Sequence, residues 1–230
     1  QSMLFDAASL FERDKFSGYD RIKGGVRANI GLRYSGAFNN GWSTHALFGQ
    51  SFHLAGRNPY ASEDFVRVGA ASGLETKSSD YVASLGLISP DGLSANAGAR
   101  FDEETFDLRR TDITAGYSSA PVSVSAVYSY IEKQPEYGYD EDRHEIRGAA
   151  SLRIHENWRI FGSGTYELTN EVLVRKSIGF AYDDECFSYT LTASEYRDPL
   201  NTDDKRRKIG FQISLRTLGE FGSSTNFGAN

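Results

Sequence analysis

The residues that could do chemistry in this 230-residue chain are few and widely spaced. Cysteine occurs once, at Cys186, which excludes an internal disulfide and any zinc site built on cysteines. Two interpretations of Cys186 stay open: a disulfide to a cysteine outside this sequence, or an inert thiol. The sequence shows no Ser-His-Asp order, no paired-carboxylate motif and no glycine-rich phosphate loop. We therefore predict no catalytic residue, no cofactor and no enzyme activity.

Acidic and histidine side chains offer two weak metal hypotheses. Asp140-Glu141-Asp142 with His144 has the carboxylates that a hard divalent cation prefers, but an exposed acidic run is more often simply solvated. His45 and His53 lie on one side of a predicted strand, more than ~20 Å apart along it, because a strand rises ~3.3 Å per residue. They cannot share a metal ion, so we predict no metal site.

A set of arginines alternates with apolar residues along the predicted strands and therefore lies on their polar side. Its members are Arg27, Arg33, Arg100, Arg147 and Arg153. Arginine binds phosphate in a bidentate manner, so these residues could contact anionic sugar phosphates. The alternative, which we favour, is that they pair with acidic residues and fill the interior of a barrel. With His45, they are the candidate lumen-facing residues.

The elements that position these side chains are strands. Apolar and polar residues alternate from about residue 26 to residue 218, and turn signals such as Asn39-Asn40-Gly41 and Ser89-Pro90-Asp91-Gly92 divide the pattern into about eleven strands. Residues 1–25 form an irregular segment with aromatic and charged residues but no strand or helix period. Residues 219–230 are predicted to be a C-terminal tail.

The connections between these strands point to a membrane barrel. Those after the odd-numbered strands are short turns, whereas those after the even-numbered strands are longer and more charged. This is the asymmetry of outer-membrane barrels, as are strands of about ten residues with aromatic residues near their ends. We predict an all-β fold, an antiparallel up-and-down transmembrane β-barrel. Because such barrels usually have an even number of strands, eleven strands suggest the C-terminal part of a larger barrel.

The composition is typical of a sheet that has one apolar face and one face exposed to water. Hydrophobic residues make up 39% of the chain, and the mean hydropathy is −0.47. The net charge of −6 gives no basic footprint for nucleic acid. The opening residues lack the basic and apolar regions of a signal peptide, so we expect any export signal to lie outside this sequence.

The stretch Leu10-Phe-Glu-Arg-Asp-Lys-Phe-Ser-Gly-Tyr-Asp-Arg21 closely resembles part of the LptD family, the outer-membrane lipopolysaccharide translocons, and looks most like its alphaproteobacterial branch. Further matches are Arg100-Phe-Asp-Glu-Glu-Thr-Phe-Asp-Leu-Arg109, Tyr182-Asp-Asp-Glu-Cys-Phe187 and Ile209-Gly-Phe-Gln-Ile-Ser-Leu-Arg-Thr-Leu-Gly219. The residues that carry the opening and turn motifs are Phe11, Phe16, Gly18, Asp20, Arg21 and Cys186.

The resemblance implies a Gram-negative outer-membrane location and a set of partners. These are lipopolysaccharide, outer-membrane lipid, a plug lipoprotein of the LptE type, the barrel-assembly machinery, and a periplasmic bridge of the LptA type that would bind an N-terminal domain. In the family a lateral gate lies between the first and last strands, and only its last-strand side can be carried over to this sequence. The residues that would represent the gate here are Lys208, Gly210, Ile213 and Leu215. The segment 1–25 would lie on the extracellular side or at the rim.

Three classes of function remain open on the sequence. The first is lipopolysaccharide transport with lateral exit near the last strand. The second is a generic porin or autotransporter-type barrel. The third is a soluble β-sandwich binding module or, among enzymes, a barrel esterase.

Overall fold

The structure is a computed structural model, and it describes residues 5–12, 25–58, 60–61, 72–135, 140–198, 205–215 and 219–228. In the range 219–228 it describes the backbone and the side chain of Ser223. Within these residues, no helix has the length and apolar character needed to cross a membrane.

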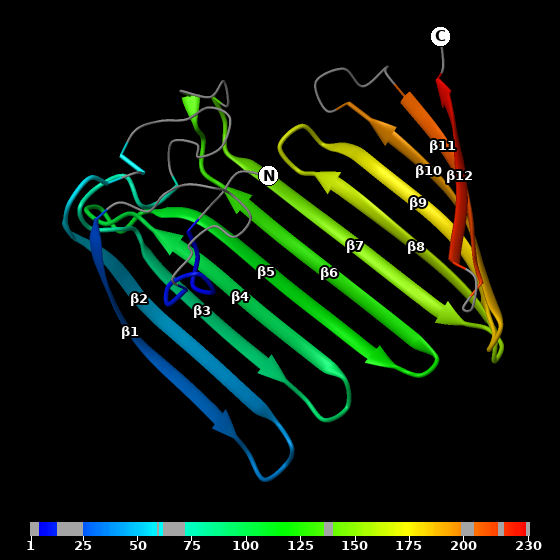
Figure 1. The fold of residues 1–230 in the computed structure, drawn as a ribbon, viewed down its shortest axis with the longest axis horizontal. Coiled ribbons are helices and arrows are strands. Elements are labelled where there is room, and N and C mark those ends of the chain that lie inside the picture. The colour runs from blue at the N-terminus through cyan, green and yellow to red at the C-terminus, as the bar shows by residue number, and fades with distance from the viewer. Residues whose placement is uncertain are drawn as a thin grey trace. The chain divides into compact units, whose positions relative to one another are not determined.

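The fold is an antiparallel, up-and-down sheet in which every strand pairs with its neighbours in the sequence (Figure 1). Strands of eight to thirteen residues alternate their side chains between two faces. They are β1 (Val26–Ala37), β2 (Ser43–Ala55), β3 (Tyr81–Ile88), β4 (Leu93–Phe101), β5 (Leu108–Ser119), β6 (Val122–Ile131), β7 (Arg143–Arg153), β8 (Trp158–Glu167), β9 (Val172–Asp183), β10 (Phe187–Arg197), β11 (Lys205–Leu215) and β12 (Gly219–Gly228).

The predicted all-β, up-and-down meander is confirmed, and so are its turns. The β1–β2 turn contains Gly41 at φ 83°, and the β3–β4 turn contains Gly92 at φ 89°. Glycine is required at position 92 for a second reason, because a Cβ atom there would collide with the carbonyl oxygen of Ser118.

Two details of the predicted layout are wrong. Residues Gly219–Gly228 form β12 and pair along β11, so the segment 219–230 is not a tail and β11 is not the last strand. The connection between β8 and β9, residues 168–171, is as short as the turn at residues 89–92. The longer connections after even-numbered strands therefore have one exception.

The described chain divides into two compact units. The first unit contains Gln1–Pro90, Ser94–Ile113 and Tyr130–Asp142. The second unit contains Asp91–Leu93, Thr114–Ser129 and Arg143–Asn230.

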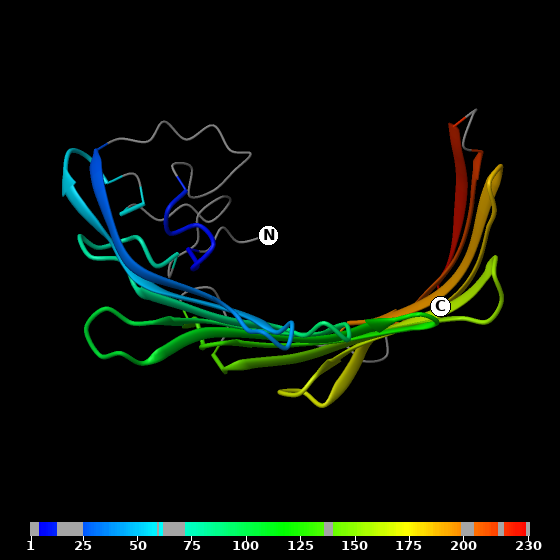
Figure 2. The same cartoon turned by 90° about the horizontal axis from the view of Figure 1, so that it is seen from below.

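In the first unit, the apolar face of β1 is exposed and the polar face is covered. Leu32 is 80% exposed on the apolar face. On the opposite face, residues 5–12 and residues 72–80 pack against β1–β3, and Figure 2 shows the segment 5–12 on one side of these strands. The buried cluster consists of Phe5, Leu10, Tyr60, Leu74 and Val82.

Leu10 lies over a pair of glycines that face each other across β1 and β2. A Cβ atom on Gly31 or Gly49 would come within 3.1 Å or 2.5 Å of the Leu10 Cδ2 atom. The backbone N–H of Phe5 donates a hydrogen bond to the carbonyl oxygen of Ser72 at 3.0 Å. Residues 5–12 are therefore docked on the polar face through complementary shape and a backbone hydrogen bond.

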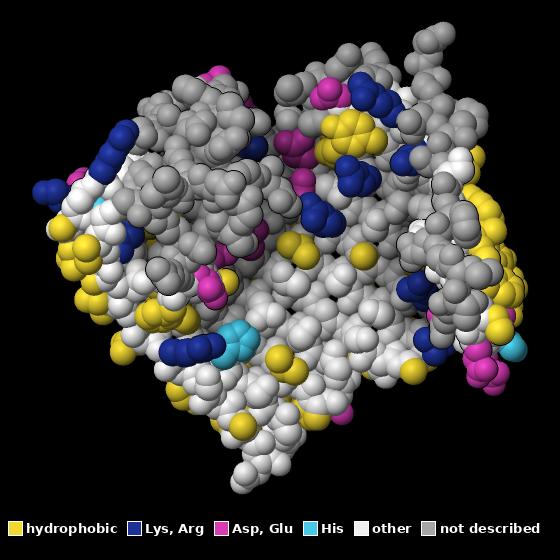
Figure 3. All heavy atoms as spheres, viewed as in Figure 1, with side chains coloured by type: hydrophobic (Ala, Val, Ile, Leu, Met, Phe, Trp, Pro, Cys, Tyr) yellow, Lys and Arg dark blue, Asp and Glu magenta, His cyan; other side chains and the backbone are white. Residues whose placement is uncertain are grey.

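In the second unit, the apolar face of β8–β10 carries an aromatic cluster at the short-turn end. The Trp158 ring lies 4.6 Å from both the Phe180 and Tyr182 rings, and 5.9 Å from the Tyr189 ring. The opposite face is mainly polar, and the Ser163 and Ser177 hydroxyls on it are hydrogen-bonded at 2.7 Å. Its aromatic residues, Phe161 and Tyr196, lie under the guanidinium groups of Arg159 and Arg175. Figure 3 shows mainly backbone and uncharged polar side chains over the short-turn halves of β6 and β7, with charged side chains nearer their other ends.

Candidate functional site

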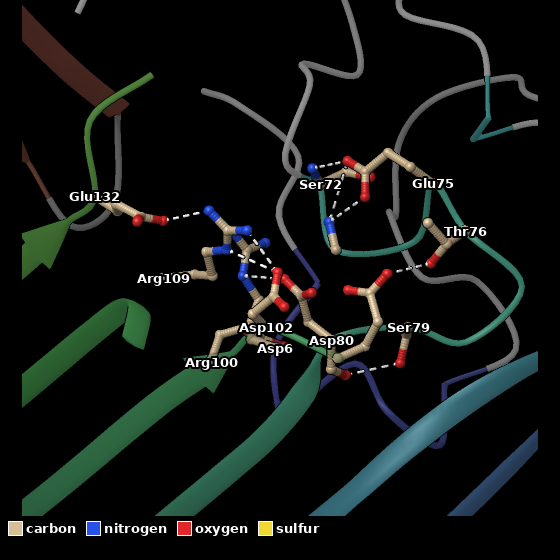
Figure 4. A network of polar contacts seen from close by, with 12 residues as sticks. Asp6, Ser72, Glu75, Thr76, Ser79, Asp80, Arg100, Asp102, Arg109 and Glu132 are labelled. Atoms are coloured by element: carbon tan, nitrogen blue, oxygen red, sulfur yellow. Dashed lines mark hydrogen bonds and ion pairs between the residues drawn. The ribbon is translucent and has the colours of Figure 1, made fainter. Parts of the chain in front are cut away.

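A buried ion pair joins the start of β3 to the end of β4 in the first unit. The Arg100 Nε atom lies 3.2 Å from the Asp80 Oδ2 atom, and the two side chains are only 5% and 9% exposed. Such a pair is costly to break, because either partner alone would be a buried, uncompensated charge. The pair lies next to the connection between β4 and β5 (Figure 4).

Asp102 organises that connection. Its Oδ1 atom accepts hydrogen bonds from the backbone N–H groups of Glu104 and Thr105 at 2.9 and 2.8 Å. Its Oδ2 atom accepts from Arg109 Nε at 3.1 Å, and Arg109 Nη1 also donates to Glu132 at 2.6 Å. The hydrogen bond from the Thr105 backbone, followed by those from Arg109, holds the pKa of Asp102 well below its usual range.

Asp80 has the opposite electrostatic character. Burial, together with a hydrogen bond to the neighbouring Glu103 carboxyl group, raises the pKa of Asp80 to about 7, although the Arg100 charge acts against this rise. Thr76 Oγ1 donates to Glu103 Oε1 at 2.8 Å.

The loop before β3 completes the network through Gly73 and Glu75. The Glu75 carboxylate accepts hydrogen bonds from the backbone N–H groups of Ser72 and Gly73. Gly73 has φ 85°, and a Cβ atom there would lie 3.1 Å from both Arg100 Nη1 and Asp80 Oδ2. Glycine allows this backbone to approach the buried ion pair.

Carboxylate oxygens of Asp80, Asp102 and Glu103 lie within 4.8 Å of one another, close enough for a hard divalent cation. Arg100 and Arg109 already engage two of these three carboxylates. The donor set is therefore satisfied by cationic side chains, and the network acts as a clamp that ties the loop before β3 to the loop after β4. We assign it no catalytic or metal-binding role.

The predicted polar-side residues of β1 and β2 have different environments. Arg27 Nη2 donates to Asn58 Oδ1 at 2.7 Å, and its guanidinium group lies 5.0 Å from the centre of the Tyr60 ring. Arg27 therefore anchors the β2–β3 loop. Arg33 is exposed, and the exposed His45 ring lies over Gly86.

The structure separates Arg100 from the other predicted arginines. Arg100 is buried beside Asp80, whereas Arg147 is 61% exposed and pairs with Glu145 at 2.9 Å. Arg153 is exposed near the short-turn end of β7. The prediction that these residues meet in one lumen-facing set stays a prediction.

The predicted motif residues lie in the turn before β10 and in the opening segment. Cys186 is exposed, and its backbone N–H donates to Asp184 Oδ1 at 2.8 Å. Phe11 is 52% exposed. Four opening-motif residues lie outside the described residues: Phe16, Gly18, Asp20 and Arg21.

The predicted gate residues lie on an interior strand of the sheet. Lys208 pairs with Ser194 on β10 and with Asn226 on β12, and Gly210, Ile213 and Leu215 are likewise paired on both sides. Their assignment to the last strand is wrong. Whether they contribute to a gate stays a prediction.

The charge network was missed as a site, although its sequence signal was present. Arg100, Asp102 and Arg109 all belong to the run Arg100–Arg109 that carries part of the family resemblance. The sequence could not indicate that Asp80 and Glu132, which are distant along the chain, complete the network.

Comparisons with known proteins agree with that resemblance. The family model described as LptD, LPS transport system D, matches residues 1–158. The chain belongs to the LptD family. The narrower likeness to its alphaproteobacterial branch stays a prediction.

Curated relatives cover nearly all of the chain at low identity. The LPS-assembly protein LptD of Saccharophagus degradans is 25% identical over 96% of this chain. The protein of the same name from Chromobacterium violaceum is 23% identical over 94%. The chain spans only 27% and 26% of the lengths of these two LptD proteins.

Among solved structures, a triple mutant of the Rhodopseudomonas blastica porin aligns with 88% of this chain and 85% of its own chain. The TM-score is 0.48 and the sequence identity is 11%.

Proposed function

We propose that this chain is part of an outer-membrane barrel that delivers lipopolysaccharide to the outer leaflet. The observation that carries the proposal is the match of the LptD family model to residues 1–158. The up-and-down sheet, with an exposed apolar face and a polar face, supports it because a barrel strand needs one side for lipid and one for water.

In this proposal, the sugar portion passes along the polar face of the strands and the acyl chains leave laterally near the last strand. The polar face of β7–β11 suits the first task, since its hydroxyl-bearing and charged side chains, such as Ser177 and Arg147, can hydrogen-bond a hydrated sugar. β12 takes the place that the sequence assigned to β11. Energy for transport comes from partners, and this chain contributes no chemical step.

The proposed partners are those that the family resemblance implies. Lipopolysaccharide is the substrate, a lipoprotein of the LptE type occupies the lumen, and a bridge of the LptA type delivers substrate through a further domain. The barrel-assembly machinery inserts the protein. On β1–β3 the segment 5–12 already covers the polar face, so we place the plug contacts away from these strands.

Depletion of the full-length protein in its native bacterium tests the proposal. We expect lipopolysaccharide at the cell surface, measured by labelling intact cells, to fall in proportion to the protein. Passage of a small hydrophilic solute across the outer membrane provides the control for a passive channel. Unchanged surface lipopolysaccharide together with reduced solute uptake would contradict the proposal and favour a porin.

A further inference from the structure

Three cations surround one carboxylate on the apolar face of β9–β11. Lys176 Nζ lies 3.3 Å from Glu195 Oε1, Arg197 Nη2 lies 3.2 Å from the same atom, and Arg207 Nε lies 3.1 Å from Glu195 Oε2. We call these four residues the cation cluster. Its formal charge is +2, because one carboxylate faces three cations.

The cations remain accessible although they pair with Glu195. The side chains of Lys176 and Arg207 are 53% and 69% exposed, while that of Glu195 is only 11% exposed. The carboxylate thus holds the cations together from beneath, and much of their surface faces outward. This arrangement leaves guanidinium and ammonium donors available to an external anion.

Strand register places the cluster at one end of an apolar surface. Glu195 pairs with Lys176 and with Arg207, and the next row on this face joins Ile178, Ala193 and Ile209. Two further rows toward the short-turn end are Phe180–Leu191–Phe211 and Tyr182–Tyr189–Ile213. The order along the strands is therefore cationic, apolar and aromatic.

A bilayer presents the same order to a barrel wall. Charged residues on the lipid face are costly at the midplane and nearly neutral at the interface, so the cationic row belongs at the headgroup level. The cluster adjoins the connection 198–204, which is on the long-loop side of the sheet. Long loops of such barrels are extracellular, which places the cluster beside outer-leaflet headgroups if the proposed function holds.

An open groove joins the charged and apolar rows. Its volume is about 620 Å³, and its lining includes Lys176, Glu195 and Arg207 together with Ile178, Ala193 and Ile209. Ile178 is 68% exposed and Ile209 is 48% exposed. The groove offers apolar contact to an acyl chain beside donors for a phosphate.

We propose that the cation cluster and this groove bind one phosphorylated, acylated lipid of the outer leaflet on the outside of the barrel wall. The phosphate lies against Arg207 and Lys176, and an acyl chain follows Ile178 and Ile209. Charge complementarity selects an anionic headgroup, and the apolar rows select a lipid over a free anion. The inference rests on the proposed outer-membrane location but does not require transport.

The test uses the full-length protein in nanodiscs of phosphatidylcholine. Bisphosphorylated lipid A is titrated into them and bound lipid is measured by native mass spectrometry. We expect Arg207→Gln to weaken binding about tenfold, the loss of one charge-assisted hydrogen-bonding partner. Arg206→Gln is the matched control, since it removes the same charge one residue away on the opposite face of β11. Equal binding by the two variants would overturn the proposal.

Two further arms identify the ligand and separate binding from folding. Lipid A without phosphates should bind wild-type protein at least as weakly as bisphosphorylated lipid A binds Arg207→Gln, because it loses the contacts with Lys176 as well as those with Arg207, and millimolar inorganic phosphate should displace little lipid. Lys176→Gln should weaken binding to a similar extent as Arg207→Gln, because the proposed phosphate position lies against both cations. Binding independent of lipid phosphates, full displacement by inorganic phosphate, or unchanged binding in Lys176→Gln would each overturn the proposal.

The experiments distinguish a failure of the proposed lipid site from a failure of the proposed transport function. Heat-modifiable migration confirms that each variant has folded before lipid is added. If depletion leaves surface lipopolysaccharide unchanged while Arg207→Gln still loses lipid, the transport proposal fails and the lipid site stands. If depletion abolishes surface lipopolysaccharide while Arg207→Gln binds lipid like Arg206→Gln, only the lipid site fails.

Discussion

The two units of the chain build their strands with the same alternation of side chains, but they treat the polar face differently. In the first unit the polar face of β1–β3 is covered, with Leu10 and Val82 fully buried. In the second unit the same face of β8–β10 carries hydroxyl-bearing residues such as Ser163 and Ser177, together with arginines that lie over the Phe161 and Tyr196 rings. The first unit thus has a buried core of its own, whereas the second presents a polar surface.

Charge is also distributed differently. The first unit places its main ion pair, Asp80 with Arg100, in a buried network on the covered side. The second unit places Lys176, Arg197 and Arg207 on the apolar side, where they remain partly exposed. A buried pair stabilises a fixed loop arrangement, and an exposed cluster at a membrane interface is available to a ligand. The charges of the first unit therefore stabilise its fold, whereas those of the cation cluster in the second unit are the ones that we propose bind a lipid.

The largest effect expected is from breaking the buried ion pair. Arg100→Met leaves Asp80 buried without its cation, which should lower the free energy of unfolding by about 3–5 kcal/mol. Arg147→Gln, at an exposed pair in the second unit, should cost less than about 1 kcal/mol. Urea unfolding of the full-length protein in detergent micelles, followed by tryptophan fluorescence, measures both. Similar losses of unfolding free energy in the two variants would show that the buried pair of the first unit is no more important for stability than the exposed pair of the second.

Docking of the opening segment should be nearly as sensitive. Leu10→Ala removes a fully buried side chain above Gly31 and Gly49, at a cost of about 2–5 kcal/mol. Phe11→Ala, at a 52% exposed position, should change the stability by less than about 1 kcal/mol. Limited proteolysis near residue 10 reports undocking, and rapid cleavage of Leu10→Ala alone is the expected result. Equal cleavage of both variants would show that the segment is not held by Leu10.

Stability of the first unit should depend on pH through Asp80. The folded-state pKa of Asp80, about 7, lies above its ordinary value of 3.8, so the folded state binds the extra proton between these values. Stability should therefore fall as pH rises from 5 to 7.5, by roughly 2 kcal/mol. Asp102 adds no pH dependence in this window, because the stabilisation from its lowered pKa is fully present above its ordinary value of 3.8 and is lost only as the pH falls below that value.

Asp80→Asn isolates this dependence. The variant cannot titrate at this position, so its urea midpoint should change little between pH 5 and pH 7.5. A wild-type midpoint that rises over the same range would contradict the assigned direction of the pKa shift.

The smallest effect concerns the aromatic cluster of the second unit. Trp158→Ala removes ring contacts with Phe180 and Tyr182, and we expect a loss of about 1–2 kcal/mol. Trp158→Phe should recover about half of it. One of the two tryptophans of the chain is lost in these variants, so unfolding is followed by heat-modifiable migration on gels instead of by fluorescence. No loss in Trp158→Ala would mean that these rings do not stabilise the strand ends.

The sequence predicted the architecture well because alternation and turn chemistry are local signals. The pattern Ala28, Ile30, Leu32 and Tyr34 needs only the two-residue period of a strand, and β1 contains it. The segment after residue 218 was missed because Gly219-Glu-Phe-Gly-Ser-Ser has a weak alternation and two glycines. Its pairing with β11 supplies the backbone hydrogen bonds that local propensity does not indicate.

The covered polar face has a signal in the sequence. Leu47 and Val82 are apolar residues on the otherwise polar side of β2 and β3, and both pack in the buried cluster. An apolar residue on a wet face indicates that something covers it. The identity of the cover, Phe5 and Leu10, depends on contacts between distant parts of the chain, which periodicity cannot predict.

The central claim is that the apolar face of these strands lies against lipid and the polar face against water. Single cysteines at Leu32 or Arg33 in β1, and at Ile178 or Ser177 in β9, test it in the full-length protein with Cys186→Ser as background. We predict that a membrane-impermeant thiol reagent labels Arg33→Cys and Ser177→Cys in isolated membranes, while Leu32→Cys and Ile178→Cys react only with a lipid-soluble reagent. The reverse pattern, or equal labelling of both faces, would contradict the account.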